Sequence, residues 1–514
     1  MKRFTTLFTI ALLSLNSISA QISEKELDEL VQKTMKTFNV PGIAVGIIKD
    51  GKLVLGKGYG VSNIRTNQKV DANTLFGIAS NSKAFTASAL AILVDEGKIK
   101  WDDKVIQHLP QFQMYNDYVT KEFTIRDLLT HRSGLGLGAG DLMIWPDGHD
   151  FTPKDIIKNI HYLKPVSGFR TKYDYDNLLY VIAGEIVAKV SGKSWCNFVE
   201  ERLMNPLEMK NSASSWNRLK DTTNVIVPHV PTNGKLEIVP RYTNTIFDAA
   251  AGLYASVNDL SHWLIMQMNE GNYNGKQLFS KESRNEMWKS QTILPVRNST
   301  PYTHNFRTYA LGWQLTDING HLQVSHTGGL DGIVTQTIMF PNEKLGIIVL
   351  TNQQSGTAFN VISNTIKDSY LGFAKFDHLA YLSKERASRE DDADKITNEV
   401  WATVDRNFKD KTIKIDTKKY IGTYKDNWFG EVTISEKKGK LYFASTRSKR
   451  LKGEVFLYKG QNFVVKWDVR SFNADAHIFF EFDSSGKVSG FKMNAISPLT
   501  DFSFDFHDLD FTKI

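Results

Sequence analysis

Hydrophobic and polar positions alternate in three distinct patterns over the first hundred residues. Apolar residues recur at helical spacing across 24–38, which predicts an amphipathic helix. Two apolar runs, 43–48 and 53–59, flank an Asp50-Gly51 pair and predict a β-hairpin. The stretch 84–94 is apolar at nearly every position, so it predicts a helix buried on all sides. A surface helix, a hairpin and a buried helix therefore follow one another along the chain.

The middle of the chain adds a second buried helix and then a series of strands. The buried helix is expected at 178–187, and the glycine-rich stretch 135–140 before it predicts a mobile loop. Apparent strands are separated by polar turns, one of them at 326–329, which is typical of an antiparallel meander; the strands are 309–315, 322–324, 333–339 and 345–350. A closing helix is expected at 358–371. We expect the terminal strands to share one sheet, with a helical region inserted between them.

Composition changes after residue 372. Residues 373–412 are rich in charge and predict a helical linker, whereas 413–514 contain short aromatic strands between glycine and asparagine turns. The second pattern predicts a small antiparallel β domain, either a barrel or a sandwich. It contains a run of basic residues that we interpret as a solvated face: Lys437, Lys438, Lys440, Arg447, Lys449, Arg450 and Lys452.

The first twenty residues have the layout of a secretory signal peptide. Lys2 and Arg3 precede the apolar run 7–13, and small residues lead to Ala20. We expect cleavage near Ala20 and an exported protein, either periplasmic or secreted. The remaining chain has no apolar run long enough for an integral membrane segment. The hydrolase-like part discussed below would then occupy 21–372.

Overall composition narrows the function classes further. The chain is 41% hydrophobic and 23% charged with a formal net charge of +7, which is typical of a globular protein and gives no case for nucleic acid. The single cysteine, Cys196, excludes an internal disulfide and predicts a packing role. Histidines and carboxylates lack metal-ligand spacing, and no phosphate-binding glycine loop is present, so no cofactor or metal is expected.

Candidate chemistry begins at Ser80 and Lys83, which open the first buried helix. Residues three apart share one helix face, so the amine would lie near the hydroxyl. The alternative is that Ser80 only caps the helix. The S-x-x-K pattern is short, and the chain contains three further matches in strand-like surroundings: Ser435/Lys438, Ser484/Lys487 and Ser489/Lys492.

Two other polar clusters, Tyr175 with Asn177 and the stretch 326–329, complete a recognisable set. In order and context the three clusters resemble the serine β-lactamase and penicillin-binding protein family, most closely its class C branch. The resemblance covers roughly 24–371 and extends beyond the three clusters to the sequence segments 74–83, 124–134, 206–210 and 251–256. It implies a β-lactamase-like α/β fold, an antiparallel sheet flanked by helices, followed here by the extra β domain.

The resemblance also implies roles for the polar residues. Ser80 would be the nucleophile, and either Lys83 or Tyr175 would accept its proton, a choice that the sequence leaves open. Asn177 would orient Lys83 and hold a substrate amide.

The remaining substrate-binding residues implied by the resemblance are His326, Thr327, Gly328 and Gly329, at the start of an edge strand. Backbone N–H groups of Ser80 and Gly329 would form an oxyanion hole, and glycine would let the substrate backbone approach.

His326 departs from most β-lactamases of this kind, which have lysine at that position. Histidine there is more similar to D-Ala-D-Ala carboxypeptidases and D-aminopeptidases. A partly charged histidine would bind a substrate carboxylate less firmly than lysine, and in a pH-dependent way.

These observations predict an exported serine hydrolase that forms an acyl-enzyme on Ser80 and cleaves amide bonds in D-amino-acid peptides or β-lactams. Two alternatives stay open: a carboxylic esterase on the same fold, and a non-catalytic penicillin-binding-like protein that binds the cell envelope. The expected partners are a small-molecule or peptide substrate and, through the basic run, an anionic envelope polymer such as the cell wall.

Overall fold

The computed structural model describes residues 21–232, 234–296, 299–413, 415–437 and 439–514; the predicted signal peptide at 1–20 lies outside them. An antiparallel sheet organises the first two thirds of the chain. The sheet joins the two ends of this region, because Ile43 of the first strand pairs with Thr351 of the last. Its strands, in spatial order, are β2 (Lys52–Gly60), β1 (Gly42–Lys49), β14 (Leu345–Thr351), β13 (Ile333–Phe340), β12 (His321–Leu330), β11 (Gln314–Ile318), β10 (Arg307–Tyr309) and β9 (Thr292–Ile293). The predicted hairpin and meander are confirmed.

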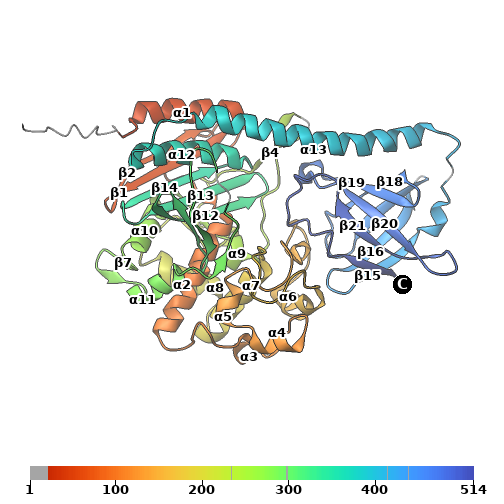
Figure 1. Cartoon of the computed structure of the whole chain (residues 1–514), viewed down its shortest axis with the longest axis horizontal. Coiled ribbons are helices and arrows are strands. Elements are labelled where there is room, and N and C mark those ends of the chain that lie inside the picture. Colours follow the sequence, from red (N-terminus) through yellow and green to blue (C-terminus); the bar gives the residue numbers. More distant parts are fainter. Residues whose placement is uncertain (1–20, 233, 297–298, 414, 438) are drawn as a thin grey trace, which may run out of the picture.

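Helices cover both faces of the sheet (Figure 1). α1 (Glu24–Phe38) and α12 (Gly356–Leu371) pack together on one face, while α10 (Val257–Met268) packs on the other. Below this second face lies the helical region, which begins with α2 (Ser82–Asp95) and comprises α3 (Val105–His108), α4 (Asp117–Glu122), α5 (Ile125–Leu128), α6 (Pro153–Asn159), α7 (Leu178–Ser191), α8 (Trp195–Val199), α9 (Asp248–Ala251) and α11 (Lys281–Met287).

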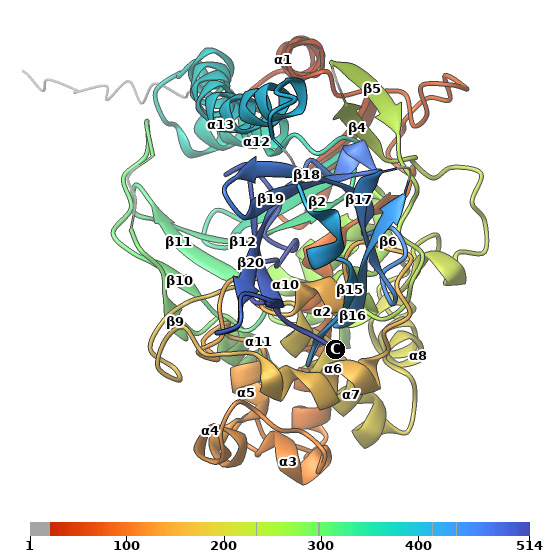
Figure 2. The ribbon, with the colours of Figure 1, turned by 90° about the vertical axis from the view of Figure 1, so that its right-hand side faces the viewer.

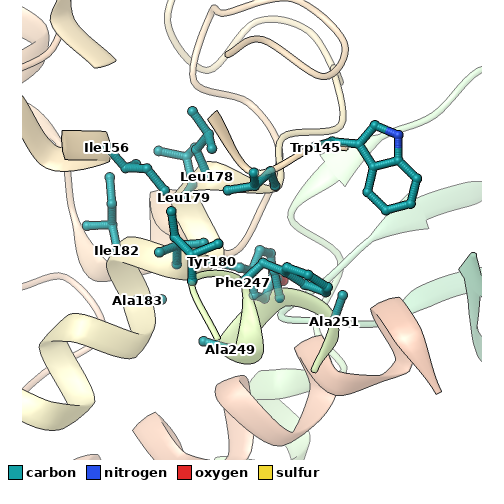
Figure 3. Packing of buried hydrophobic residues seen from close by; sticks show 14 of the residues in the cluster. Trp145, Ile156, Leu178, Leu179, Tyr180, Ile182, Ala183, Phe247, Ala249 and Ala251 are labelled. Atoms are coloured by element: carbon teal, nitrogen blue, oxygen red, sulfur yellow. The ribbon is translucent and has the colours of Figure 1, made fainter. Parts of the chain in front are cut away.

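The two predicted buried helices, α2 and α7, form the centre of the helical region. Figure 3 shows the packing around α7, where Leu178, Leu179 and Ile182 lie among other apolar side chains close to α9. The approach of α7 to α9 requires a glycine, since a Cβ at Gly184 would lie 2.5 Å from the Ala249 side chain. α9 also packs against α2, so the three helices α2, α7 and α9 contact one another.

The C-terminal part forms a closed barrel rather than a sandwich. The strands follow chain order around the barrel, and β22 closes it by pairing with β15; they are β15 (Gly422–Asp426), β16 (Gly430–Lys437), β17 (Lys440–Ser445), β18 (Lys452–Lys459), β19 (Asn462–Trp467), β20 (Ala476–Phe482), β21 (Val488–Ala495) and β22 (Asp510–Lys513). The predicted charged helix is α13 (His378–Lys409), which runs along the top of Figure 1 from the sheet to the barrel. Among the described residues, no helix is long and apolar enough to span a membrane.

The barrel lies beside the helical region (Figure 1) and contacts it through a bridge between His149 and Ser448; Figure 2 shows the molecule from the barrel side. Arg447 forms ion pairs with Asp150 and Asp155, and its guanidinium lies 3.8 Å from the centre of the Phe151 ring. The interpretation of the basic run as a solvated face is therefore wrong for Arg447. The sequence does not reveal this, because a barrel arginine and two loop carboxylates meet only when the domains dock.

The prediction of a turn at 326–329 is also wrong, since these residues continue β12. Two glycines in a row suggested a turn, but here they lie in extended backbone. A Cβ at Gly328 would lie 2.3 Å from the Ile78 carbonyl oxygen, so glycine is needed for close packing of the strand on the Ser80 turn.

Candidate active site

Ser80 lies in a 3₁₀ turn, η1 (Ala79–Asn81), immediately before α2. The preceding Ala79 has φ of +49°, a left-handed conformation that costs energy for a residue with a side chain. Asn81 holds the turn in place: its Nδ2 donates to Thr335 Oγ1 at 2.9 Å and its Oδ1 accepts from Thr337 Oγ1 at 2.7 Å. Neither η1 nor α2 has a side-chain cap, so the capping alternative for Ser80 is wrong.

Lys83 is fully buried and lies directly beside Ser80. Its Nζ is 3.1 Å from Ser80 Oγ, 2.7 Å from Asn177 Oδ1 and 3.0 Å from the Ala250 carbonyl oxygen. Burial lowers the pKa of Lys83 from 10.5 to about 7, against the opposing charges of Asp141 and Asp176. Near neutral pH a substantial fraction of this amine is therefore neutral and able to accept a proton.

The Ser489/Lys492 match to the same sequence pattern lacks this geometry. Both residues lie in strand β21, where positions three apart point to opposite faces. A buried helical turn is what makes Ser80 and Lys83 neighbours.

Tyr175 and Asn177 lie in the loop before α7, on the other side of Lys83. Lys83 Nζ is 4.9 Å from the centre of the Tyr175 ring, and the His131 ring packs on Tyr175 with 4.1 Å between centres. Burial raises the pKa of Tyr175 well above 10, while a hydrogen bond with the Ser80 side chain acts in the opposite direction. Tyr175 is therefore a neutral phenol at the site.

His326 is buried, and protein groups occupy both of its ring nitrogens. Nδ1 is 2.6 Å from the Thr327 carbonyl oxygen, so Nδ1 carries the hydrogen and Nε2 accepts from the Tyr309 hydroxyl at 2.9 Å. Burial and the nearby Lys83 lower the pKa of His326 to about 3. This differs from the expected partial charge near neutral pH, because the sequence does not reveal that the ring is desolvated beside a second basic group.

The strand β12 offers a free edge to the site, although it lies inside the sheet. Its pairing with β11 stops at Ser325, whereas its pairing with β13 continues to Leu330. Thr327 and Gly329 line the cavity at Ser80, and Gly328 faces the packed Ser80 turn. The structure therefore brings together all eight residues expected from the sequence. The expectation that 326–329 start an edge strand is wrong: they lie in the second half of β12, an interior strand of the sheet, and only this half has a free edge.

Asp141 is a site residue that sequence reasoning missed. Its fully buried Oδ2 accepts from Asn177 Nδ2 at 2.7 Å and from Ser503 Oγ, a barrel-domain residue, at 2.9 Å. An unbroken chain of hydrogen bonds thus runs from Ser503 through Asp141, Asn177 and Lys83 to Ser80. Burial raises the pKa of Asp141 well above its usual value. No motif surrounds Asp141 or Ser503, so only the fold brings them to the site.

The glycine-rich stretch 135–140 is packed against this network, so the prediction of a mobile loop is wrong. Gly138 N donates to the Tyr175 carbonyl oxygen at 2.8 Å, and Gly140 N donates to Asp505 Oδ2 at 2.6 Å. A Cβ at Gly138 would lie 2.7 Å from the Phe502 carbonyl oxygen. Here glycine permits close approach of the barrel loop.

A cavity of about 560 Å³ opens above Ser80, and the barrel supplies one of its walls. Ser80, Tyr175 and Asn177 line its floor, with Lys83 buried beneath them, and aromatic side chains from both domains surround it. The barrel residues that line it are Ser471, Phe472, Asn473, Leu499, Asp501, Phe502, Ser503 and Phe504. The sequence contained no signal for this wall, because neither barrel loop carries a recognisable motif.

Potential metal ligands gather elsewhere, on the barrel side of the interface. Ligand atoms of Asp505, His507 and Asp508 lie within 4.8 Å of one another. None of the three lines the cavity at Ser80.

Comparison with known proteins identifies the family. The family model described as Beta-lactamase matches residues 27–370, which is more than half of the chain. The chain belongs to the β-lactamase family. A second family model, described as a domain of unknown function (DUF3471), matches residues 411–513, the barrel. All the catalytic candidates thus lie in the β-lactamase region, while Ser503 and the aromatic wall lie in the second domain.

Individual relatives are distant. The chain is 27% identical over 370 residues to Unguisins hydrolase ungD' of Aspergillus campestris, a match that spans 69% of this chain and 64% of that protein. It is 28% identical over 338 residues to Protein flp of Staphylococcus aureus, spanning 65% of this chain and 64% of that one. The chain therefore spans less than two thirds of the length of these curated relatives.

A solved structure resembles nearly the whole chain. The octameric penicillin-binding protein homologue from Pyrococcus abyssi matches with a TM-score of 0.62 and 23% identity, over 93% of this chain and 99% of that one. At this identity the likeness is one of fold.

Proposed function

We propose that this protein is a serine hydrolase that forms an acyl-enzyme on Ser80 and cleaves amide bonds, in D-amino-acid peptides or β-lactams. The observation that carries the proposal is the buried Lys83 amine 3.1 Å from Ser80 Oγ, with its pKa lowered to about 7. A serine hydroxyl is a weak nucleophile and needs such a base within reach. The same pair weighs against the non-catalytic alternative, because binding alone needs no buried lysine beside a serine.

Of the two candidate bases, we infer that Lys83 takes the Ser80 proton during acylation. Burial lowers the pKa of Lys83 and raises the pKa of Tyr175. It therefore favours a neutral Lys83 amine, which can accept a proton, and disfavours a Tyr175 phenolate. As Ser80 Oγ bonds to the substrate carbonyl carbon, its proton passes to Lys83. Tyr175 then gives its phenolic proton to the leaving nitrogen and regains one from the Lys83 ammonium.

The other residues bind and orient in this scheme. Asn177 commits Oδ1 to Lys83 and one N–H to Asp141, which leaves its second N–H for a substrate carbonyl. The N–H groups of Ser80 and Gly329 receive the developing oxyanion, as the family resemblance implies. His326 acts by shape, since its neutral ring and two occupied nitrogens offer no charge to a substrate.

Carboxylic-ester hydrolysis is the second candidate function. The cavity walls favour it, because Trp145, Phe247, Phe472 and Phe502 present aromatic surface suited to an apolar acyl group. Comparing kcat/KM for p-nitrophenyl butyrate with that for an amide of the same acyl group ranks the two functions.

Labelling tests the nucleophile assignment. We expect fluorescent penicillin or a fluorophosphonate probe to modify Ser80, as located by mass spectrometry, and Ser80→Ala to lose both label and turnover. Ser489→Ala, from an S-x-x-K match that lies in a strand, is the matched control and should keep both. An adduct on another residue, or full turnover by Ser80→Ala, would refute the assignment.

The proposal places the enzyme outside the cytoplasm, on the basis of the signal-like pattern at 1–20. Secreted material beginning at Gln21, measured by intact mass, would support it, and retention of residues 1–20 would oppose it. Support for an anionic polymer partner is weaker than the basic run suggested. Arg447 is engaged with the other domain, and Lys440 pairs with Glu454.

A further inference from the structure

The cavity above Ser80 contains two carboxyl groups that the proposed chemistry does not use. Asp331 follows β12 directly and lines the cavity, and Asp501 reaches it from the barrel loop. Both line the same cavity, and the negative charge of Asp501 raises the pKa of Asp331. One side of the site therefore joins a carboxyl from each domain.

These carboxyls lack a cationic partner. Among the described residues, no hydrogen bond or ion pair is found for the Asp331 side chain, and the Asp501 carboxylate accepts only from Ser503, whose N–H lies at 2.9 Å. Arg450 is the nearby cation that acts on Asp331, but its guanidinium lies over the Phe472 ring, 4.8 Å from the ring centre, and forms no ion pair within 4 Å. Burial in the cavity and the charges of Asp501 and Asp147 raise the pKa of Asp331 to about 7.

The remainder of the lining contains nothing that would hold a substrate carboxylate. No lysine or arginine is found among the described residues that line the cavity, and His326 is neutral. Lys83 already contacts three protein oxygens below the floor. The walls near the carboxyls are aromatic, with Trp145, Phe472 and Phe504, and aromatic faces attract cations as well as apolar groups.

We propose that Asp331 and Asp501 form an ammonium subsite, so that the enzyme takes aminoacyl compounds whose amino group is free. This inference rests on the proposed function and names its substrate class. The substrate ammonium would donate charge-assisted hydrogen bonds to the two carboxyl groups, and the substrate side chain would contact the aromatic walls. The cavity, about 560 Å³, is large enough for an aminoacyl group together with a small leaving group. Because Asp501 comes from the barrel, the second domain would determine specificity.

Kinetics on the full chain test the subsite. The probes are D-phenylalanine p-nitroanilide and its N-acetyl derivative, which differ only in the charged amine. We expect kcat/KM to be at least tenfold higher for the free amine, and Asp331→Asn and Asp501→Asn each to lower this ratio about tenfold. Glu385→Gln, an exposed carboxylate on α13, is the matched control and should leave the ratio unchanged. A ratio near one in the native chain, or variants with the native ratio, would overturn the inference.

Calorimetry separates the subsite from the chemistry. In the Ser80→Ala chain, D-phenylalaninamide should bind at least tenfold more tightly than N-acetyl-D-phenylalaninamide. If Ser80-dependent turnover is absent but this binding preference is present, the proposed function fails and the subsite stands. If Ser80 turns over both anilides and calorimetry shows equal binding, the proposed function stands and the subsite is refuted. The calorimetric measurement needs no substitution at Asp331 or Asp501, so misfolding of those variants does not affect its result.

Discussion

Asp141 offers a sharp test of how the barrel domain acts on the nucleophile. Its Oδ2 holds Asn177 at 2.7 Å and Ser503 at 2.9 Å, and Asn177 in turn holds Lys83 at 2.7 Å. Asp141→Ala removes the acceptor and frees Asn177 to turn away from the lysine. A hydrogen bond to a charged group contributes about 2 kcal/mol, so we expect kcat/KM to fall about thirtyfold. Ser503→Ala removes one neutral donor worth about 1 kcal/mol and should cost about fivefold.

The isosteric variant Asp141→Asn separates charge from position. An asparagine can still accept from Asn177, but it no longer raises the pKa of Lys83. The Lys83 pKa should then fall, and the acid limb of the kcat/KM profile should move to lower pH. Burial raises the pKa of Asp141 in the folded state, so its ionised form destabilises the fold at neutral pH. Asp141→Asn should therefore unfold at the same or a higher temperature than the native chain.

Steady-state kinetics across pH and thermal unfolding on the same samples provide the assay. Ser489→Ala, on the barrel surface, controls for a serine substitution in the second domain. An unchanged rate for Asp141→Ala would refute the positioning role. An acid limb that stays in place in Asp141→Asn would show that Asp141 carries no charge in the native site, and the electrostatic argument would be wrong.

Three further predictions follow from the geometry. In the native chain, kcat/KM should rise with pH through about 7, because Lys83 must lose its proton to act as a base; a profile flat from pH 5 to 9 would contradict this. Gly328→Ala should abolish Ser80 labelling, since its Cβ would lie 2.3 Å from the Ile78 oxygen, and retained labelling would argue against the close packing. Arg447→Ala should destabilise the docked barrel by about 1–2 kcal/mol in denaturant unfolding, whereas Lys452→Ala, on the same domain, should not.

Local sequence patterns predicted the elements that carry the site. The sequence predicted the helices at 24–38 and 178–187, the hairpin and the closing helix. These elements are predictable because side-chain periodicity and turn residues act over only a few positions. The failures have the same origin. The glycines at 135–140 suggested a mobile loop and those at 326–329 a turn, but the first segment is a packed loop and the second a strand, because glycine at these places allows close packing against distant backbone.

The sequence by itself determined the Ser80, Lys83, Tyr175 and Asn177 set, because a reactive group, its base and its orienting residue must be particular residue types at particular spacings. Tertiary structure decided the protonation states of the site residues and which other residues surround them. Desolvation of Lys83 and His326 depends on every element packed around them, and the position of Asp141, Ser503 and Asp501 depends on how the barrel docks. Such effects arise between residues hundreds of positions apart, so no local pattern encodes them.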